Sequence, residues 1–160
     1  MGRVTREHED IDICIYREDV KEALRYFEGW DIKVAVPGEN RLVDYEQLND
    51  LSLPRYCLHL FREKDFIEVL LTERKENDVL FRKNKEITMR ITDFALKDRD
   101  GRPYVNPVWQ LLFKSSSPRD KDNDDFIRCL PIMTDQQKKW LIEGLRIMKP
   151  ESEWIHRLSV

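Results

Sequence analysis

The chain has 160 residues, of which 41% are hydrophobic and 37% charged, so the composition predicts one soluble, globular domain with a substantial core. Its net charge of −3 argues against a general nucleic-acid binder, which normally carries a strong basic excess. The sequence has no apolar run near the roughly 18 residues of a membrane span and no signal peptide. Its three cysteines are odd in number and far apart, so we expect reduced core residues in a cytoplasmic protein and neither a disulfide framework nor a zinc site.

In chain order, the first part of the sequence alternates with the period of a strand. A helix is expected over 17–30, and residues 42–53 are mixed and consistent with a short helix or a loop. Strands are predicted over 11–16, 30–36, 55–63 and 65–73. A polar segment, 74–86, follows these strands. The turn at 98–101 then predicts a hairpin between the segment 86–98 and residues 102–105.

After residue 105 the hydrophobic period changes from 2 to 3.6 and predicts helices over 107–115, 118–133 and 135–149. Asn106 is a suitable N-cap before Pro107, and Thr134 with Gln137 matches a capping box. The expected fold is therefore α+β. A mixed-sheet core with flanking helices occupies 1–105, and a helical C-terminal region packed on it occupies 106–160.

Asp10 and Asp12 stand two apart among isoleucines in the first strand. Side chains at i and i+2 share one face about 7 Å apart, so both carboxylates could converge on Mg²⁺. Glu68 is the only charge in the apolar run 66–71 and is a candidate third acid. The alternative is that all three acids only mark the wet face of half-exposed strands.

The segment GRVTREHEDIDICI, residues 2–15, resembles the G-R-x-T-R-x-H-x-D-I-D segment of aminoglycoside 2''-adenylyltransferase-like proteins, within the DNA polymerase beta-type nucleotidyltransferase superfamily. The segment VNPVWQLLFKSSSPRDKDNDDF, residues 105–126, also resembles these proteins, in which a Pro-started helix carries a Lys and precedes a K-D-x-x-D run. The resemblance implies a nucleotidyltransferase-type sheet followed by a helical subregion.

The resemblance also implies an activity: transfer of a nucleoside monophosphate from an NTP such as ATP to a hydroxyl of a small, aminoglycoside-like acceptor, with Mg²⁺. Asp10 and Asp12 would hold the metal, and Glu68 would complete the site or accept the acceptor hydroxyl's proton. No nucleic-acid or membrane partner is implied, and nothing in the sequence supports a protein partner.

Four further residues are candidates for binding the nucleotide: Arg6, His8, Lys114 and Lys121. Arginine and lysine are good phosphate ligands, and His8 falls within the resembling segment. The alternative for His8 is a loop histidine bonded to a neighbouring acid. For the two lysines it is a solvated loop beside the aspartates of 120–125. His59, between Leu58 and Leu60, is interpreted as an ordinary strand residue.

One feature of the superfamily is missing from the sequence. In these proteins a Gly-Gly or Gly-Ser turn opening a helix lies upstream of the paired acids and grips the phosphates. Only nine residues precede Asp10, and they contain no Gly pair. We therefore expect a fold that is incomplete at its N-terminus, and the alternative function is an inactive remnant or binding module.

Overall fold

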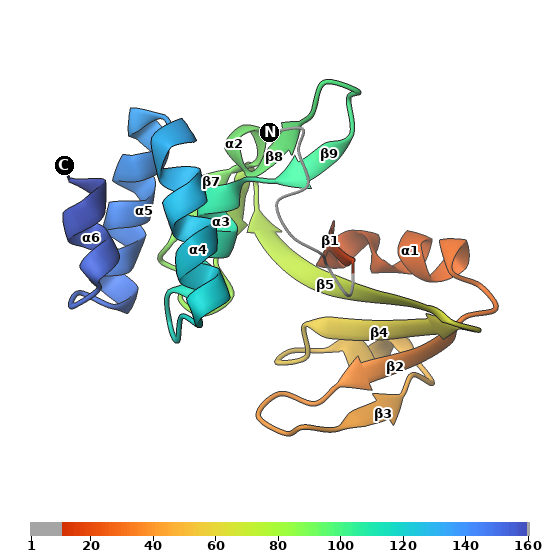
Figure 1. The fold of residues 1–160 in the computed structure, drawn as a ribbon. Helices are drawn as coiled ribbons and strands as arrows, with labels where there is room; N and C mark the ends of the chain where they lie inside the picture. Colours follow the sequence, from red (N-terminus) through yellow and green to blue (C-terminus); the bar gives the residue numbers. More distant parts are fainter. Residues whose placement is uncertain (1–10, 160) are drawn as a thin grey trace. The chain divides into compact units, whose positions relative to one another are not determined.

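The computed structural model describes residues 11–159, and the chain divides into two compact units, one up to Arg82 and the other from Lys83 onward (Figure 1). The sequence predicted a boundary at 105/106 instead. The segments between residues 83 and 105 belong to the second unit, with the C-terminal helices. We describe each unit by itself.

The first unit is a sheet with one short helix. Its elements are β1 (Asp12–Tyr16), η1 (Arg17–Asp19), α1 (Val20–Tyr26), β2 (Asp31–Ala35), β3 (Leu42–Asp44), η2 (Leu48–Leu51), β4 (Cys57–Arg62), β5 (Asp65–Lys75) and β6 (Asp78–Leu80). Strands β3, β2, β4 and β5 follow one another as antiparallel neighbours. The long strand β5 also pairs with β1 in parallel and, near its end, with β6 antiparallel. The segment 42–53 thus holds a short strand and a 3₁₀ turn.

Period-two alternation decides which face of this sheet is buried. Val34, Leu58 and Val69 are directly opposite one another on β2, β4 and β5, and each is at most 2% exposed. Val20 of helix α1 and Phe27, directly after the helix, belong to the same cluster. One face of the sheet therefore forms the core of the unit, and the alternate residues project to the other face.

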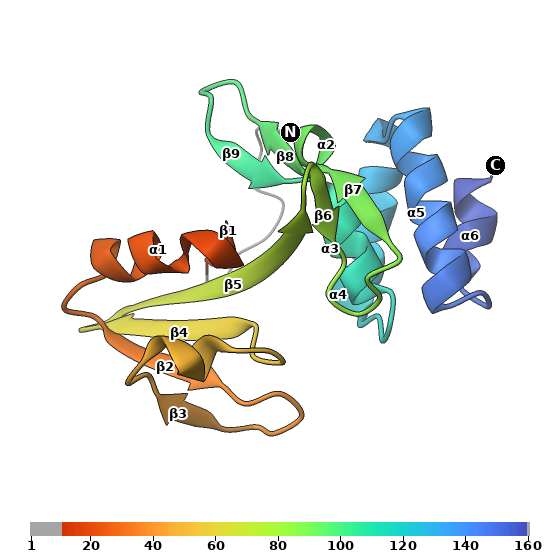
Figure 2. The same cartoon turned by 180° about the vertical axis from the view of Figure 1, so that it is seen from behind.

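The second unit consists of short strands followed by helices (Figure 2). Its elements are β7 (Thr88–Arg90), α2 (Ile91–Phe94), β8 (Ala95–Lys97), β9 (Pro103–Val105), α3 (Pro107–Lys114), α4 (Asp120–Cys129), η3 (Leu130–Ile132), α5 (Asp135–Met148) and α6 (Glu153–Leu158). The predicted hairpin is present as β8 and β9. Helix α6 was not anticipated.

Helix starts in this unit follow the capping residues. The Asn106 side chain accepts a hydrogen bond from the Val108 backbone N–H, and Thr134 and Gln137 form the expected reciprocal box. The predicted start of α4 at residue 118 is corrected to Asp120. There, Asp122 accepts a hydrogen bond from the Arg119 backbone N–H, so the cap lies later than Ser117.

Aliphatic and aromatic side chains pack these helices together. Leu112 of α3 lies against Gly144 of α5, where an added Cβ would come within 2.8 Å of it. Trp109 stacks on Trp140, and Phe126 stacks on Trp154 with ring centroids 4.4 Å apart. These tryptophans are therefore packing residues. A small residue at 144 is thus needed for the close approach of α5 to α3.

The mixed α+β class is confirmed, with strands preceding a helical C-terminal part. Within residues 11–159, every helix is too short or too polar to cross a membrane.

Leu58 provides a test of the core assignment. Replacing Leu58, which is 2% exposed, by Ala should lower the free energy of unfolding by about 2–5 kcal/mol, because it leaves a cavity between β2 and β5. Leu42→Ala, at a 39% exposed position of the same sheet, should change it by less than about 1 kcal/mol. Urea unfolding measures both variants, and equal losses would contradict the assigned faces.

Candidate functional site

A row of polar side chains crosses the sheet of the first unit. Asp12 of β1 is opposite Glu68 of β5, which is opposite His59 of β4; His59 is in turn opposite Lys33 of β2, and Lys33 is opposite Asp44 of β3. Residues directly opposite in neighbouring strands project to the same face. We call these five residues the polar row, and they lie on the face opposite the apolar core.

Charges within the polar row are largely compensated by neighbours. The Lys33 ammonium pairs with Asp44 and, at 3.4 Å, with Asp31. The His59 Nε2 lies 3.2 Å from Glu68 Oε1. Both side chains of the second pair are about a quarter exposed, so solvent and small ligands can reach them.

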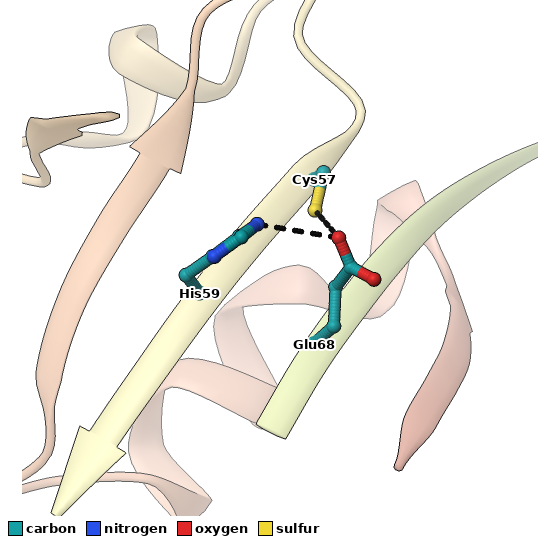
Figure 3. Close-up of side chains that lie close together, drawn as sticks. All are labelled: Cys57, His59 and Glu68. Atoms are coloured by element: carbon teal, nitrogen blue, oxygen red, sulfur yellow. Dashed lines mark hydrogen bonds and ion pairs between the residues drawn. The ribbon is translucent and has the colours of Figure 1, made fainter. Parts of the chain in front are cut away.

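Glu68 accepts from two side chains of the adjacent strand (Figure 3). The Cys57 thiol donates to Glu68 Oε1 with a sulfur–oxygen distance of 2.9 Å, and His59 Nε2 contacts the same oxygen. One potential ligand atom from each of the three residues lies within 4.8 Å of the others. Cys57 and His59 are two apart on β4, so the strand itself brings them to one face.

These contacts set the protonation of the group. Burial acts to raise the pKa of Glu68, but hydrogen bonds with Cys57 and Asp12, together with the nearby His59, outweigh it and hold the pKa below its usual value. Burial, then the hydrogen bond to Glu68 and its negative charge, raise the pKa of the Cys57 thiol far above its usual value. At neutral pH, Glu68 is therefore a carboxylate and Cys57 a thiol.

The structure brings together two of the three predicted acids. Asp12 is exposed, opposite Glu68, and hydrogen-bonded to it. Asp10, and the candidate nucleotide-binding residues Arg6 and His8, lie outside the described residues. Asp12 and Glu68, the two predicted acids within the described residues, thus lie on one face of neighbouring strands.

The two candidate lysines belong to the second unit. Lys114 Nζ lies 2.6 Å from Asp125 Oδ2 and 3.4 Å from Asp122 Oδ1, so Lys114 ties α3 to α4. Lys121 is exposed on α4. The basic–acidic run of the sequence is therefore in part an ion-pair network within this unit.

Asp122 is the buried centre of that network. Its side chain is 2% exposed, and the Arg119 Nε lies 2.9 Å from Oδ2. The side-chain hydrogen bond from Arg119 lowers the pKa of Asp122 to about 2, and the Arg119 backbone N–H and the Lys114 charge assist against the opposing effect of burial. Asp122 is consequently ionised at all but strongly acidic pH.

The sequence interpretation missed Cys57 and His59. The cysteine was expected in the core and the histidine was set aside as a strand residue, whereas both are half-buried on the polar face. The signal was a Cys-x-His spacing on one strand. The register of β4 and β5 decides which acid faces Cys57 and His59, and the sequence alone does not specify that register.

Comparisons with protein-family models, with curated proteins and with solved structures found no match.

Asp122 supplies a test of the ion-pair network. Its pKa is lower in the folded chain than the unfolded value of 3.8, so its stabilisation is present above about pH 4 and is lost as the pH falls toward 2. The shift corresponds to about 2 kcal/mol. In Asp122→Asn, the free energy of unfolding should therefore fall less between pH 5 and pH 2, by about that amount, than in the unaltered chain.

Urea unfolding followed by tryptophan fluorescence measures this difference. Asp124→Asn, at an exposed position of the same helix, is the matched control and should keep the pH dependence of the unaltered chain. An identical acid response in the Asp122 variant and the unaltered chain would contradict the role given to Asp122.

Proposed function

We propose that this chain is a Mg²⁺-dependent nucleotidyltransferase that transfers a nucleoside monophosphate from an NTP to a hydroxyl of a small molecule. The observation that carries the proposal is the pairing of Asp12 with Glu68. The resemblance at residues 2–15 requires a third acid on a later strand close to the paired aspartates. Glu68, chosen from sequence for that role, lies directly opposite Asp12.

The residues present suit Mg²⁺. This ion takes oxygen ligands and is commonly held by one or two carboxylates together with substrate phosphates. Asp12 is exposed and is hydrogen-bonded to a second carboxylate, that of Glu68. When bound, Mg²⁺ would neutralise charge on the triphosphate. Two adjacent acids without a cation must share a proton or repel one another, which is consistent with a place for a cation.

The environment of Glu68 favours one of its two predicted roles. Two donors already occupy Oε1, while Figure 3 shows the other carboxylate oxygen pointing away from Cys57 and His59. A carboxylate whose pKa is held low is a weak base but a good ligand. We therefore propose that Glu68 completes the cation site and is not the main acceptor of the hydroxyl proton.

The nucleotide's phosphates need cationic partners as well. Lys121 is exposed and remains a candidate from the sequence, as do Arg6 and His8, which lie outside the described residues. Lys114 would have to leave Asp125 to bind a phosphate. Within the second unit, Lys114 instead holds α3 and α4 together.

Thermal unfolding with Mg²⁺ and ATP or GTP tests the proposal. A ligand at about 100 times its dissociation constant adds about 2.7 kcal/mol, which raises the melting temperature by about 5–10 °C for a chain of this size. The shift should need both Mg²⁺ and nucleotide, and Asp12→Asn should abolish it because the cation loses an oxygen ligand.

Asp44→Asn is the matched control, because Asp44 belongs to the same polar row but is separated from Asp12 by four strand pairings. That variant should keep the full shift. No Mg²⁺-dependent shift in a chain that unfolds cooperatively would contradict the proposal and support a binding module of the same fold. If Asp12→Asn and Asp44→Asn lose the melting-temperature shift equally, Asp12 is not a specific ligand of the cation.

A further inference from the structure

Three different metal-binding side chains converge on the polar face of the first unit. Among the described residues, the Cys57 sulfur, a His59 ring nitrogen and a Glu68 oxygen lie within 4.8 Å of one another. All three are partly buried, and His59 and Glu68 remain about a quarter exposed. The group is thus open to solvent but partly enclosed by the sheet.

We propose that Cys57, His59 and Glu68 form a binding site for Zn²⁺. Sulfur and imidazole ligands select Zn²⁺ and similar transition metals, whereas Mg²⁺ prefers oxygen alone. The site is therefore chemically distinct from the carboxylate pair of the proposed nucleotidyltransferase centre, although Glu68 belongs to both. Its existence does not depend on the proposed activity.

The spacing of the ligand atoms fits this ion. Tetrahedral Zn²⁺ places its ligand atoms about 3.3–3.6 Å apart, given its usual bond lengths. The Glu68 Oε1–His59 Nε2 distance of 3.2 Å is already close to that range. The Cys57 Sγ–Glu68 Oε1 distance of 2.9 Å is that of a thiol–carboxylate hydrogen bond and would have to open slightly.

Binding exchanges a proton for the metal. In the metal-free chain, the thiol proton of Cys57 lies between sulfur and the Glu68 carboxylate. When Zn²⁺ binds, a zinc–sulfur bond forms, the sulfur–hydrogen bond breaks and the proton leaves to solvent. The Glu68 carboxylate binds through a lone pair, and His59 binds through Nε2 after the proton that this nitrogen donates to Glu68 has moved to Nδ1 by exchange with solvent, so the imidazole stays neutral. Three protein ligands leave a fourth position for water or another small ligand.

Charges around the group favour a cation. Asp12 on β1 is hydrogen-bonded to Glu68, so the two carboxyl groups share a proton and together carry one negative charge on this face of the sheet. Two cations oppose this: Lys33, whose charge is compensated by Asp44 and Asp31, and Arg82, whose positive charge acts on Cys57. Zn²⁺ would therefore enter a site of net negative charge once the thiol is deprotonated.

Cobalt substitution tests the proposal on the full chain, reduced and free of metal. Co²⁺ bound to this ligand set should give a thiolate-to-cobalt charge-transfer band in the near ultraviolet and visible bands of tetrahedral intensity. The titration should end at one Co²⁺ per chain, and Zn²⁺ should bleach the bands. Excess Mg²⁺ should leave the thiolate-to-cobalt band in place, because Mg²⁺ competes only for the shared Glu68 carboxylate and not for sulfur and nitrogen.

Variants identify the ligands. Cys57→Ser should abolish the charge-transfer band, and His59→Gln should weaken Co²⁺ binding at least tenfold, the order of loss expected when one ligand is removed. Cys14→Ser is the matched control, because Cys14 projects to the same face but lies outside the three-residue group. Asp12→Asn should also retain the band, which separates this site from the proposed nucleotide centre.

The titration of the unaltered chain decides the question even if a variant fails to fold. No charge-transfer band there would overturn the proposal. A band that survives in folded Cys57→Ser or disappears in folded Cys14→Ser would also overturn it, and circular dichroism establishes the folding of each variant.

Discussion

The structure of the first unit depends on one register shared by four neighbouring strands. Ile13, Val69, Leu58 and Val34 form an apolar line across β1, β5, β4 and β2. Because side chains alternate with a period of two, a slip of one residue in any strand would bury charges and expose this line. Burial of the apolar line therefore fixes the register, and the polar row on the opposite face follows from it.

The two ends of the polar row differ in chemistry. At one end Lys33 is neutralised by acids on its own and the adjacent strand, an exposed arrangement that contributes little free energy of folding. At the other end, the Glu68 carboxylate has several hydrogen-bond partners. These are Asp12 and His59 of the polar row, and Cys57, which lies beside the row on β4. Strongly perturbed protonation around such a group is typical of functional sites, which is why both proposals centre on Glu68.

The second unit relies on a different constraint. Its helices begin at polar caps and pack closely, as where Leu112 of α3 lies against Gly144 of α5. Asp122 contributes both to capping and to packing, because its carboxylate caps the start of α4 and also pairs with Arg119 and Lys114. A buried carboxylate with that many donors keeps its charge, and it fixes the position of α4 against α3.

The sequence by itself determined the elements whose signal is local. Strand alternation predicted β1, β2, β4 and β5, caps at Asn106 and Thr134 predicted α3 and α5, and the turn before β9 predicted a hairpin. The lone charge in an apolar strand also pointed to Glu68. Only the tertiary structure decided what faces it, because strand register depends on burial of side chains far apart in the chain. That register placed Asp12 on one side of Glu68, and His59 with Cys57 on the other.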